Sequence, residues 1–157
     1  MLFKKKKRTK KILERKSPDE AVIEIGYMLT IEIMKNPNSL SHEEFTVGLI
    51  TTLEGEINSG GFESFFWNQY GNYTNESIKA LEEIGSSNEL RILTQAALAF
   101  PDGKVPKDIN ERQNFMDQNE DYLEEYWAPL DQEFWTSKEN TIDMLFEYIH
   151  ENIEQFR

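Results

Sequence analysis

The chain has 157 residues, a net charge of −12 at pH 7, 38% hydrophobic residues and no cysteine. This length suits one domain, and the apolar content is sufficient for a core, which excludes wholesale disorder. The missing cysteines exclude disulfide bridges and thiolate metal sites, so we expect a protein of a reducing compartment, the cytoplasm. No apolar run reaches the roughly 20 residues of a membrane helix, and no apolar signal-peptide segment follows the basic N-terminus.

The first sixteen residues are strongly basic. They hold nine Lys or Arg residues and one Glu, so the rest of the chain carries eight basic and twenty-eight acidic residues. Because residues 1–16 show no sustained apolar period, we expect a mobile basic arm there, followed by an acidic helical domain over residues 17–157. An anionic body of this kind repels nucleic acid and attracts basic partners.

Two long helices are predicted after this arm. The first begins at Ser17, which can form a capping box with Glu20, and it ends near Asn36. The second begins at Ser41 and carries apolar residues every four positions, namely Phe45, Leu49, Leu53 and Ile57. We expect the Gly60-Gly61 pair to end it, because glycine accepts the left-handed backbone that a helix end commonly needs.

The stretch from residue 62 to Gly71 is rich in aromatic rings and predicts a short helix. Its phenylalanines Phe62, Phe65 and Phe66 share one face, and we interpret them as core rings at a tight corner between helices. Asn68 is expected to cap or bridge backbone groups. The alternative is a small-ligand pocket at this corner, lined by Trp67, Asn68 and Tyr70.

Further helices complete the prediction. One is capped by Thr74 or Asn75, a buried helix covers residues 88–100, and another begins near Asp108. The next runs from about residue 121 and should kink or restart at Pro129, and the last opens at Thr136 or Ser137. Since no segment alternates β-branched with polar residues, the fold class is all-α: a single-domain bundle of several helices with short connecting helices.

A search for catalytic chemistry finds no candidate. His42 and His150 both have acidic neighbours in sequence, but a zinc site needs three or four converging ligands, so we interpret both as surface histidines. There is no nucleophile elbow, no phosphate-binding loop ending in Lys-Ser/Thr and no dinucleotide fingerprint. We expect a protein that is not an enzyme and that holds neither a cofactor nor a metal.

Two groups of acidic residues are candidate partner-binding sites. On the last helix the carboxylates lie within a narrow arc opposite the apolar stripe: Asp143, Glu147, Glu151 and Glu154. The earlier group is Glu120, Asp121, Glu124, Glu125, Asp131 and Glu133. Four helical residues advance about 6 Å, close to the roughly 6.8 Å of two phosphate steps along one DNA strand. Solubility through net charge is the alternative interpretation.

The segment INSGGFESFFWNQYGNYTNESIKALEEIGS, followed by FPDGKVPKDINER, resembles the bacterial DNA-mimic proteins of the DMP type. The matching positions are Gly60, Gly61, Phe62, Phe65, Phe66, Asn68, Gly71, Leu81, Ile84, Gly85, Pro106, Asp108 and Arg112, whereas Ser59 stands where the family pattern has Asn. The resemblance covers roughly residues 20–155. It implies an all-helical, acidic, dimeric protein that presents carboxylates in place of DNA phosphates to a DNA-binding protein.

These observations favour a non-enzymatic protein that binds a basic protein, such as a DNA-binding regulator, and that neither binds nucleic acid through its acidic body nor spans a membrane. One alternative is an immunity-type inhibitor of a basic toxin or nuclease, which would use the same acids. The other is a small-molecule binder built on the aromatic Gly-Gly corner.

Overall fold

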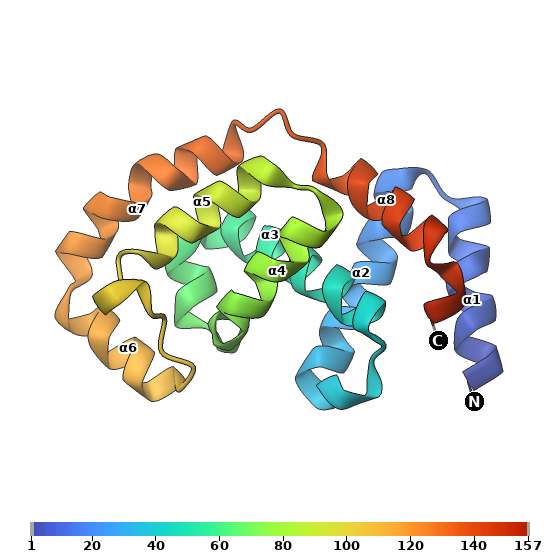
Figure 1. Ribbon diagram of the computed structural model, residues 1–157, viewed down its shortest axis with the longest axis horizontal. Coiled ribbons are helices and arrows are strands. Elements are labelled where there is room, and N and C mark those ends of the chain that lie inside the picture. Colours follow the sequence, from blue (N-terminus) through green and yellow to red (C-terminus); the bar gives the residue numbers. More distant parts are fainter. Residues whose placement is uncertain (1, 157) are drawn as a thin grey trace. The chain divides into compact units, whose positions relative to one another are not determined.

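The computed structural model describes the backbone of residues 2–156 and the side chains of residues 8–156. All regular elements in this range are helices, which confirms the all-α prediction (Figure 1). The α-helices are α1 (Leu2–Arg15), α2 (Pro18–Lys35), α3 (His42–Trp67), α4 (Thr74–Ile84), α5 (Ser87–Ala97), α6 (Ile109–Gln118), α7 (Glu120–Trp135) and α8 (Thr141–Glu151). Short 3-10 helices connect them: η1 (Pro37–Ser39), η2 (Gln69–Tyr73), η3 (Pro101–Gly103) and η4 (Ile153–Gln155).

The contacts divide the chain into two compact units, of which the first holds the residues up to Thr52 and those from Asn140 onward. In this unit α2 packs against α8 and α1, and α1 lies along η4. The core residues include Ile25, Leu29, Leu145, Ile149 and Phe156. The predicted cap of α2 is confirmed, because the Glu20 amide donates to the Ser17 hydroxyl and the Ser17 amide donates to the Glu20 carboxylate.

Residues 2–15 form a helix, whereas we expected no regular structure in this basic segment. Thr9 and Ile12, three positions apart, are both buried, so α1 has a short inward stripe that meets α2 and η4. A buried stripe of one or two turns is too short for its helical period to be distinguished from chance in the sequence. The lysines and arginines around it also make the segment strongly polar.

The second unit, Leu53–Glu139, is built around an aromatic core. Phe62, Phe65 and Phe66 are buried, as predicted for the corner. The Phe66 ring stacks on Trp127 with 5.1 Å between centroids and meets Phe100 edge-on at the same distance. The Trp127 indole N–H donates to the carbonyl of Ala96 on α5, so α3, α5 and α7 converge on this ring cluster.

The Gly-Gly pair, which we expected to end the helix, forms a kink inside α3. Gly61 has φ +69°, in the left-handed region that favours glycine, and the helix resumes at Phe62. A Cβ atom at Gly61 would also meet the Asp131 carboxylate at 2.4 Å, so both the backbone and the close approach require glycine here. The helix begins after Ser41 as expected, and Ser41 and Glu44 form a capping box there.

Two predicted helix starts were wrong. Helix α4 begins at Thr74 with Tyr73 at the cap position, so neither Thr74 nor Asn75 caps it. Helix α7 runs through Pro129 as one element, so of the two outcomes expected at this proline, a kink or a restart, the restart is absent. The last helix begins at Thr141 with Asn140 as its cap, not at Thr136 or Ser137. The reason is that both hydroxyls have other partners: Thr136 donates back to Gln132 at the end of α7, and Ser137 accepts from Asn88 and from the Glu139 amide.

Candidate functional site

The net charge of the chain lies in one unit. The first unit contains eleven acidic and eleven basic residues, whereas Leu53–Glu139 contains eighteen acidic and six basic residues. Two of those six basic residues already pair with carboxylates, Arg91 with Glu133 and Lys107 with Glu76. The second unit is therefore the anionic part of the molecule.

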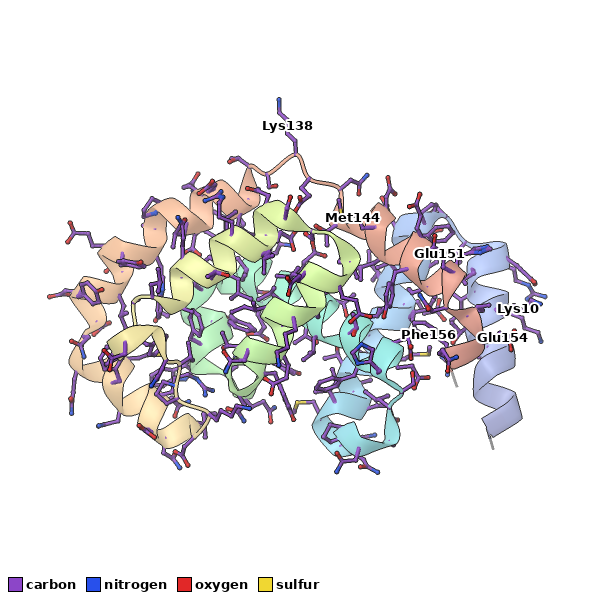
Figure 2. All side chains as sticks on the ribbon, viewed as in Figure 1. Lys10, Lys138, Met144, Glu151, Glu154 and Phe156 are labelled. Atoms are coloured by element: carbon purple, nitrogen blue, oxygen red, sulfur yellow. The ribbon has the colours of Figure 1, made fainter. Side chains whose placement is uncertain are left out.

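The acidic group of the last helix lies in the neutral unit. Asp143, Glu147 and Glu151 are exposed on α8, and Glu154 is exposed on η4. Helix α1, which carries Lys10 and most of the basic residues of this unit, packs along η4 (Figure 2). Since positive charge from α1 lies in the same compact unit, it offsets the field of this acidic face.

The other predicted group belongs to α7 and divides in two. Glu120, Asp121, Glu124 and Glu125 are exposed on its first two turns. Asp131 and Glu133 are only partly exposed, and both have partners within the unit, the Phe62 amide and Arg91 respectively. Within this predicted group, the openly exposed acids are thus those of the N-terminal half of α7.

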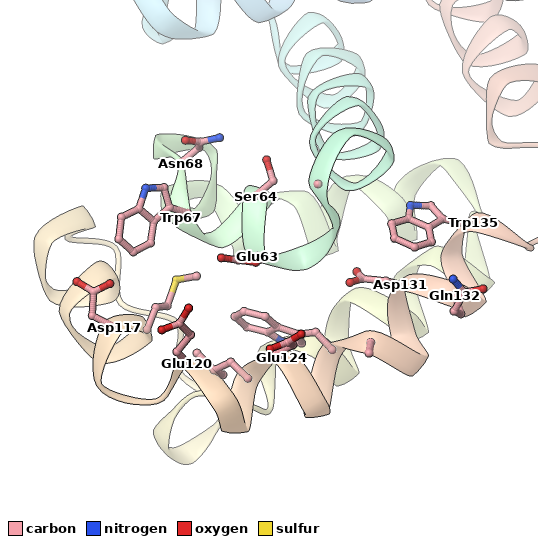
Figure 3. A pocket seen from close by; sticks show the side chains of 15 residues that line it. Glu63, Ser64, Trp67, Asn68, Asp117, Glu120, Glu124, Asp131, Gln132 and Trp135 are labelled. Carbon is pink, nitrogen blue, oxygen red and sulfur yellow. The ribbon is translucent and has the colours of Figure 1, made fainter.

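A cavity of about 690 Å³ opens between the kinked end of α3 and helices α6 and α7 (Figure 3). Five carboxylate residues line it: Glu63, Asp117, Glu120, Glu124 and Asp131. The remaining lining residues are Gly60, Ser64, Trp67, Asn68, Met116, Leu123, Trp127, Ala128, Gln132 and Trp135, so no Lys, Arg or His reaches the wall. Trp67 and Asn68, two of the three residues named for a ligand pocket, do line it, whereas Tyr70 does not.

Two tryptophans of the cavity wall are partly exposed, Trp67 at 38% and Trp135 at 46%. The Trp135 indole N–H donates to the Ile57 carbonyl at 2.9 Å, which fixes the edge of that ring and leaves a face open. The backbone of Trp67 is held by Gln113, which donates to its carbonyl. A hydrogen bond to the scaffold therefore holds the Trp135 ring directly, whereas the bond from Gln113 holds only the backbone of Trp67.

Asp131 joins the cavity to the Gly-Gly kink. Its Oδ1 accepts a 2.8 Å hydrogen bond from the Phe62 amide, the first free donor after the kink. Burial raises the pKa of Asp131, and this outweighs the hydrogen bond from Phe62, which lowers it; the charge of nearby Glu63 raises it further. The carboxylate thus lies among groups that disfavour its negative charge.

Asn68 has a different role from the one predicted. Its side chain does not cap η2 but donates to Glu56 Oε2 at 2.7 Å, and the Ser64 hydroxyl donates to the same oxygen at 2.8 Å. Glu56 precedes the kink and the other two residues follow it. The three side chains therefore bridge the two parts of α3.

The buried guanidinium of Arg112 packs against Gly71, and both residues are positions of the motif that carries the family resemblance. It donates to the carbonyls of Phe66, Asn68 and Pro106 and to the Asn72 side chain, which ties η2 to α6. A Cβ atom at Gly71 would meet Arg112 Nε at 2.7 Å. Burial lowers the pKa of Arg112, and the charge of Asp108 counters that effect.

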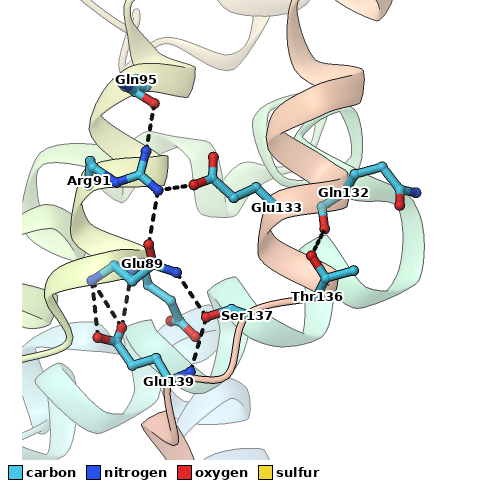
Figure 4. A network of polar contacts seen from close by, with 9 residues as sticks. Glu89, Arg91, Gln95, Gln132, Glu133, Thr136, Ser137 and Glu139 are labelled. Carbon is cyan, nitrogen blue, oxygen red and sulfur yellow. Dashed lines mark hydrogen bonds and ion pairs between the residues drawn. The ribbon is translucent and has the colours of Figure 1, made fainter.

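Glu139 caps α5, a role that we did not foresee (Figure 4). Its carboxylate accepts from the Ser86 hydroxyl at 2.7 Å and from the amides of Asn88 and Glu89 at 3.1 Å. Burial raises the pKa of Glu139, but the hydrogen bonds from Ser86, Asn88 and Glu89 outweigh it, so the net shift is downward. The capping residue lies about fifty positions from the helix that it caps, beyond the reach of a local motif.

A family model described as DMP19-like protein matches residues 38–152. The chain belongs to the DMP19-like family. All cavity-lining residues fall within the matched segment, whereas α1 and α2 lie before it. The expected resemblance is therefore confirmed, although the match begins later than the predicted residue 20.

Neither the search of curated proteins nor that of solved structures finds a match to this DMP19-like chain. Among the residues that the structure describes, no three or more His, Cys, Asp or Glu side chains are placed to hold a metal ion. Nor is any described helix both long and apolar enough to cross a membrane.

Proposed function

We propose that this member of the DMP19-like family is a non-enzymatic binding protein whose acidic unit engages the basic surface of a DNA-binding protein in place of DNA. The observation that carries this proposal is the charge division, eighteen acidic against six basic residues in Leu53–Glu139 and a neutral balance in the other unit. Charge concentrated in one unit steers a basic partner to it, whereas charge spread for solubility would not.

The contact surface in this proposal is the N-terminal half of α7, with Glu120, Asp121, Glu124 and Glu125 as the carboxylates that replace phosphates. Successive turns place these side chains about 6 Å apart along the helix. The four acids of α8 and η4 contribute less, because the basic α1 belongs to the same unit. This ranking narrows the two groups expected from the sequence to one.

The experiment is capture from nuclease-treated lysate on the immobilised protein, with identification of what is retained by mass spectrometry. We expect retention of a basic DNA-binding protein at low salt, its release by added double-stranded DNA and its loss as salt is raised, because exposed charge pairs are screened. A retained protein that DNA does not displace would contradict mimicry. A retained nuclease whose activity is blocked would instead support the immunity-type inhibitor.

We also propose that the protein acts in the cytoplasm, as the missing cysteines suggest, and that it forms the homodimer implied by the family resemblance. Light scattering of the purified chain tests the dimer: a monomer mass at micromolar concentration would remove it from the account without affecting the acidic surface.

A further inference from the structure

The cavity beside α7 differs from an ordinary surface hollow in its charge. Each of its charged lining residues is acidic, and they come from both walls: Glu63 from α3, and Glu124 and Asp131 from α7. Figure 3 shows these carboxylates around one shared space. A site of about 690 Å³ lies within the range of roughly 300–1,000 Å³ typical of small-molecule pockets.

The tryptophans supply an independent indication of a ligand. Trp67 and Trp135 lie at opposite sides of the cavity, each with more than a third of its surface exposed (Figure 3). An indole face attracts an organic cation, most strongly among the aromatic side chains. Trp127, Leu123 and Met116 give the same cavity an apolar floor, on which aliphatic carbon can pack.

The spacing of the carboxylates distinguishes between kinds of cation. Glu120 and Asp131 both line the cavity from α7 and are eleven residues apart, which corresponds to about 16 Å along a helix. No described cluster of three or more acidic, His or Cys side chains is compact enough for a metal ion. Carboxylates spread along an apolar floor instead match several ammonium groups separated by alkyl spacers.

We propose that this cavity is a binding site for a small linear polyamine, with its ammonium groups on the carboxylates and the indole faces and its alkyl chain on the apolar floor. The site goes beyond the proposed partner surface, with which it shares only Glu120 and Glu124. Glu63 and Trp67 belong to the cavity alone, and they allow the two proposals to be tested separately.

Spermidine is the probe, titrated into the full-length protein by calorimetry at constant ionic strength, with tryptophan fluorescence as a second signal. We expect one site per chain and a change in indole emission. E63Q, which removes an exposed carboxylate without changing its shape, should weaken binding about tenfold, as expected for a lost charge-assisted hydrogen bond of roughly 1.5 kcal/mol. W67L should weaken spermidine binding as well.

The control variant is E147Q, which removes one carboxylate from α8 and should leave spermidine binding within about twofold, since Glu147 does not line the cavity and salt screens a single exposed charge. Circular dichroism of each variant confirms the fold. Equal weakening by E63Q and E147Q would overturn the proposal, as would the same signal from Mg²⁺ at matched ionic strength. Binding of a lysine-rich peptide without binding of spermidine would also overturn it and assign the cavity to a protein partner.

Discussion

The carboxylate of Asp131 on α7 accepts a hydrogen bond from the amide of Phe62, the first residue after the kink in α3, at 2.8 Å. This contact joins positions 69 residues apart in the chain and leaves no space for a Cβ atom at Gly61. It holds the two walls of the acidic cavity together, so the cavity and the family's Gly-Gly motif depend on the same pair of residues.

Replacing Asp131 by Ala should destabilise the protein by about 1–3 kcal/mol, because the Phe62 amide loses the carboxylate that accepts its hydrogen bond in a partly buried place. The measurement is urea unfolding. E133A on the same helix is the control, since Glu133 forms an exposed pair with Arg91 that contributes at most about 1 kcal/mol. A smaller loss for D131A than for E133A would show that the contact does not hold the corner.

Replacing Arg112 by Lys should lower the free energy of unfolding by about 3 kcal/mol or more. The ammonium of Lys cannot reach the carbonyls of Phe66, Asn68 and Pro106 together, as the planar guanidinium does, so buried acceptors lose their donors. R91K, an exposed Arg-to-Lys change in the same unit, should cost less than 1 kcal/mol. Comparable thermal midpoints for the two variants would contradict this assignment.

Replacing Glu139 by Gln should remove part of the acid sensitivity of folding. The folded-state pKa of Glu139 lies below its usual value. The contribution of this carboxylate to folding stability is therefore present above about pH 4.5 and is lost as the pH falls through the folded pKa. We therefore expect E139Q to be less stable than the wild type at pH 7 and the difference to shrink toward pH 3. A constant difference across that range would argue against the capping role.

The contribution of Glu54 to folding stability should change with pH in the opposite direction to that of Glu139. Burial raises the pKa of Glu54, and a hydrogen bond with Glu89 on α5 only partly counters this. The folded state then holds a proton more tightly than the unfolded chain, so the stability from this group is full below about pH 4.5 and falls as the pH rises through the folded pKa. E54Q replaces the carboxyl group by an amide, which can still donate a hydrogen bond but cannot become charged. The stability of E54Q relative to the wild type should therefore increase between pH 5 and pH 8. A stability difference that does not change with pH would contradict the raised pKa of Glu54.

Features encoded within a few residues were predictable from the sequence. Ser17 and Ser41 capped their helices as expected, because a capping box needs only four consecutive positions. Gly61 adopted the left-handed backbone, and the phenylalanines beside it formed the core. The identity of the family followed from the same short motif.

Features that depend on tertiary contacts were not predictable. Arg112, Glu139 and Asp131 bind groups 40 to 69 residues away, apart from local contacts of Arg112, so no spacing reveals them. Helix α1 was missed because its buried pair, Thr9 and Ile12, spans one turn. The cavity was foreseen only as an alternative at the aromatic corner, because the α7 side chains that complete it lie more than fifty residues further along the chain.

The most direct test of the account compares two variants that each remove four carboxylates. One is E120Q/D121N/E124Q/E125Q on α7, and the other is D143N/E147Q/E151Q/E154Q on α8 and η4. Capture of the DNA-binding partner at low salt, quantified by mass spectrometry, should fall at least about tenfold for the α7 variant and stay within about twofold for the other. Equal loss in both variants, or full capture by the α7 variant, would contradict a DNA-mimicking surface on α7.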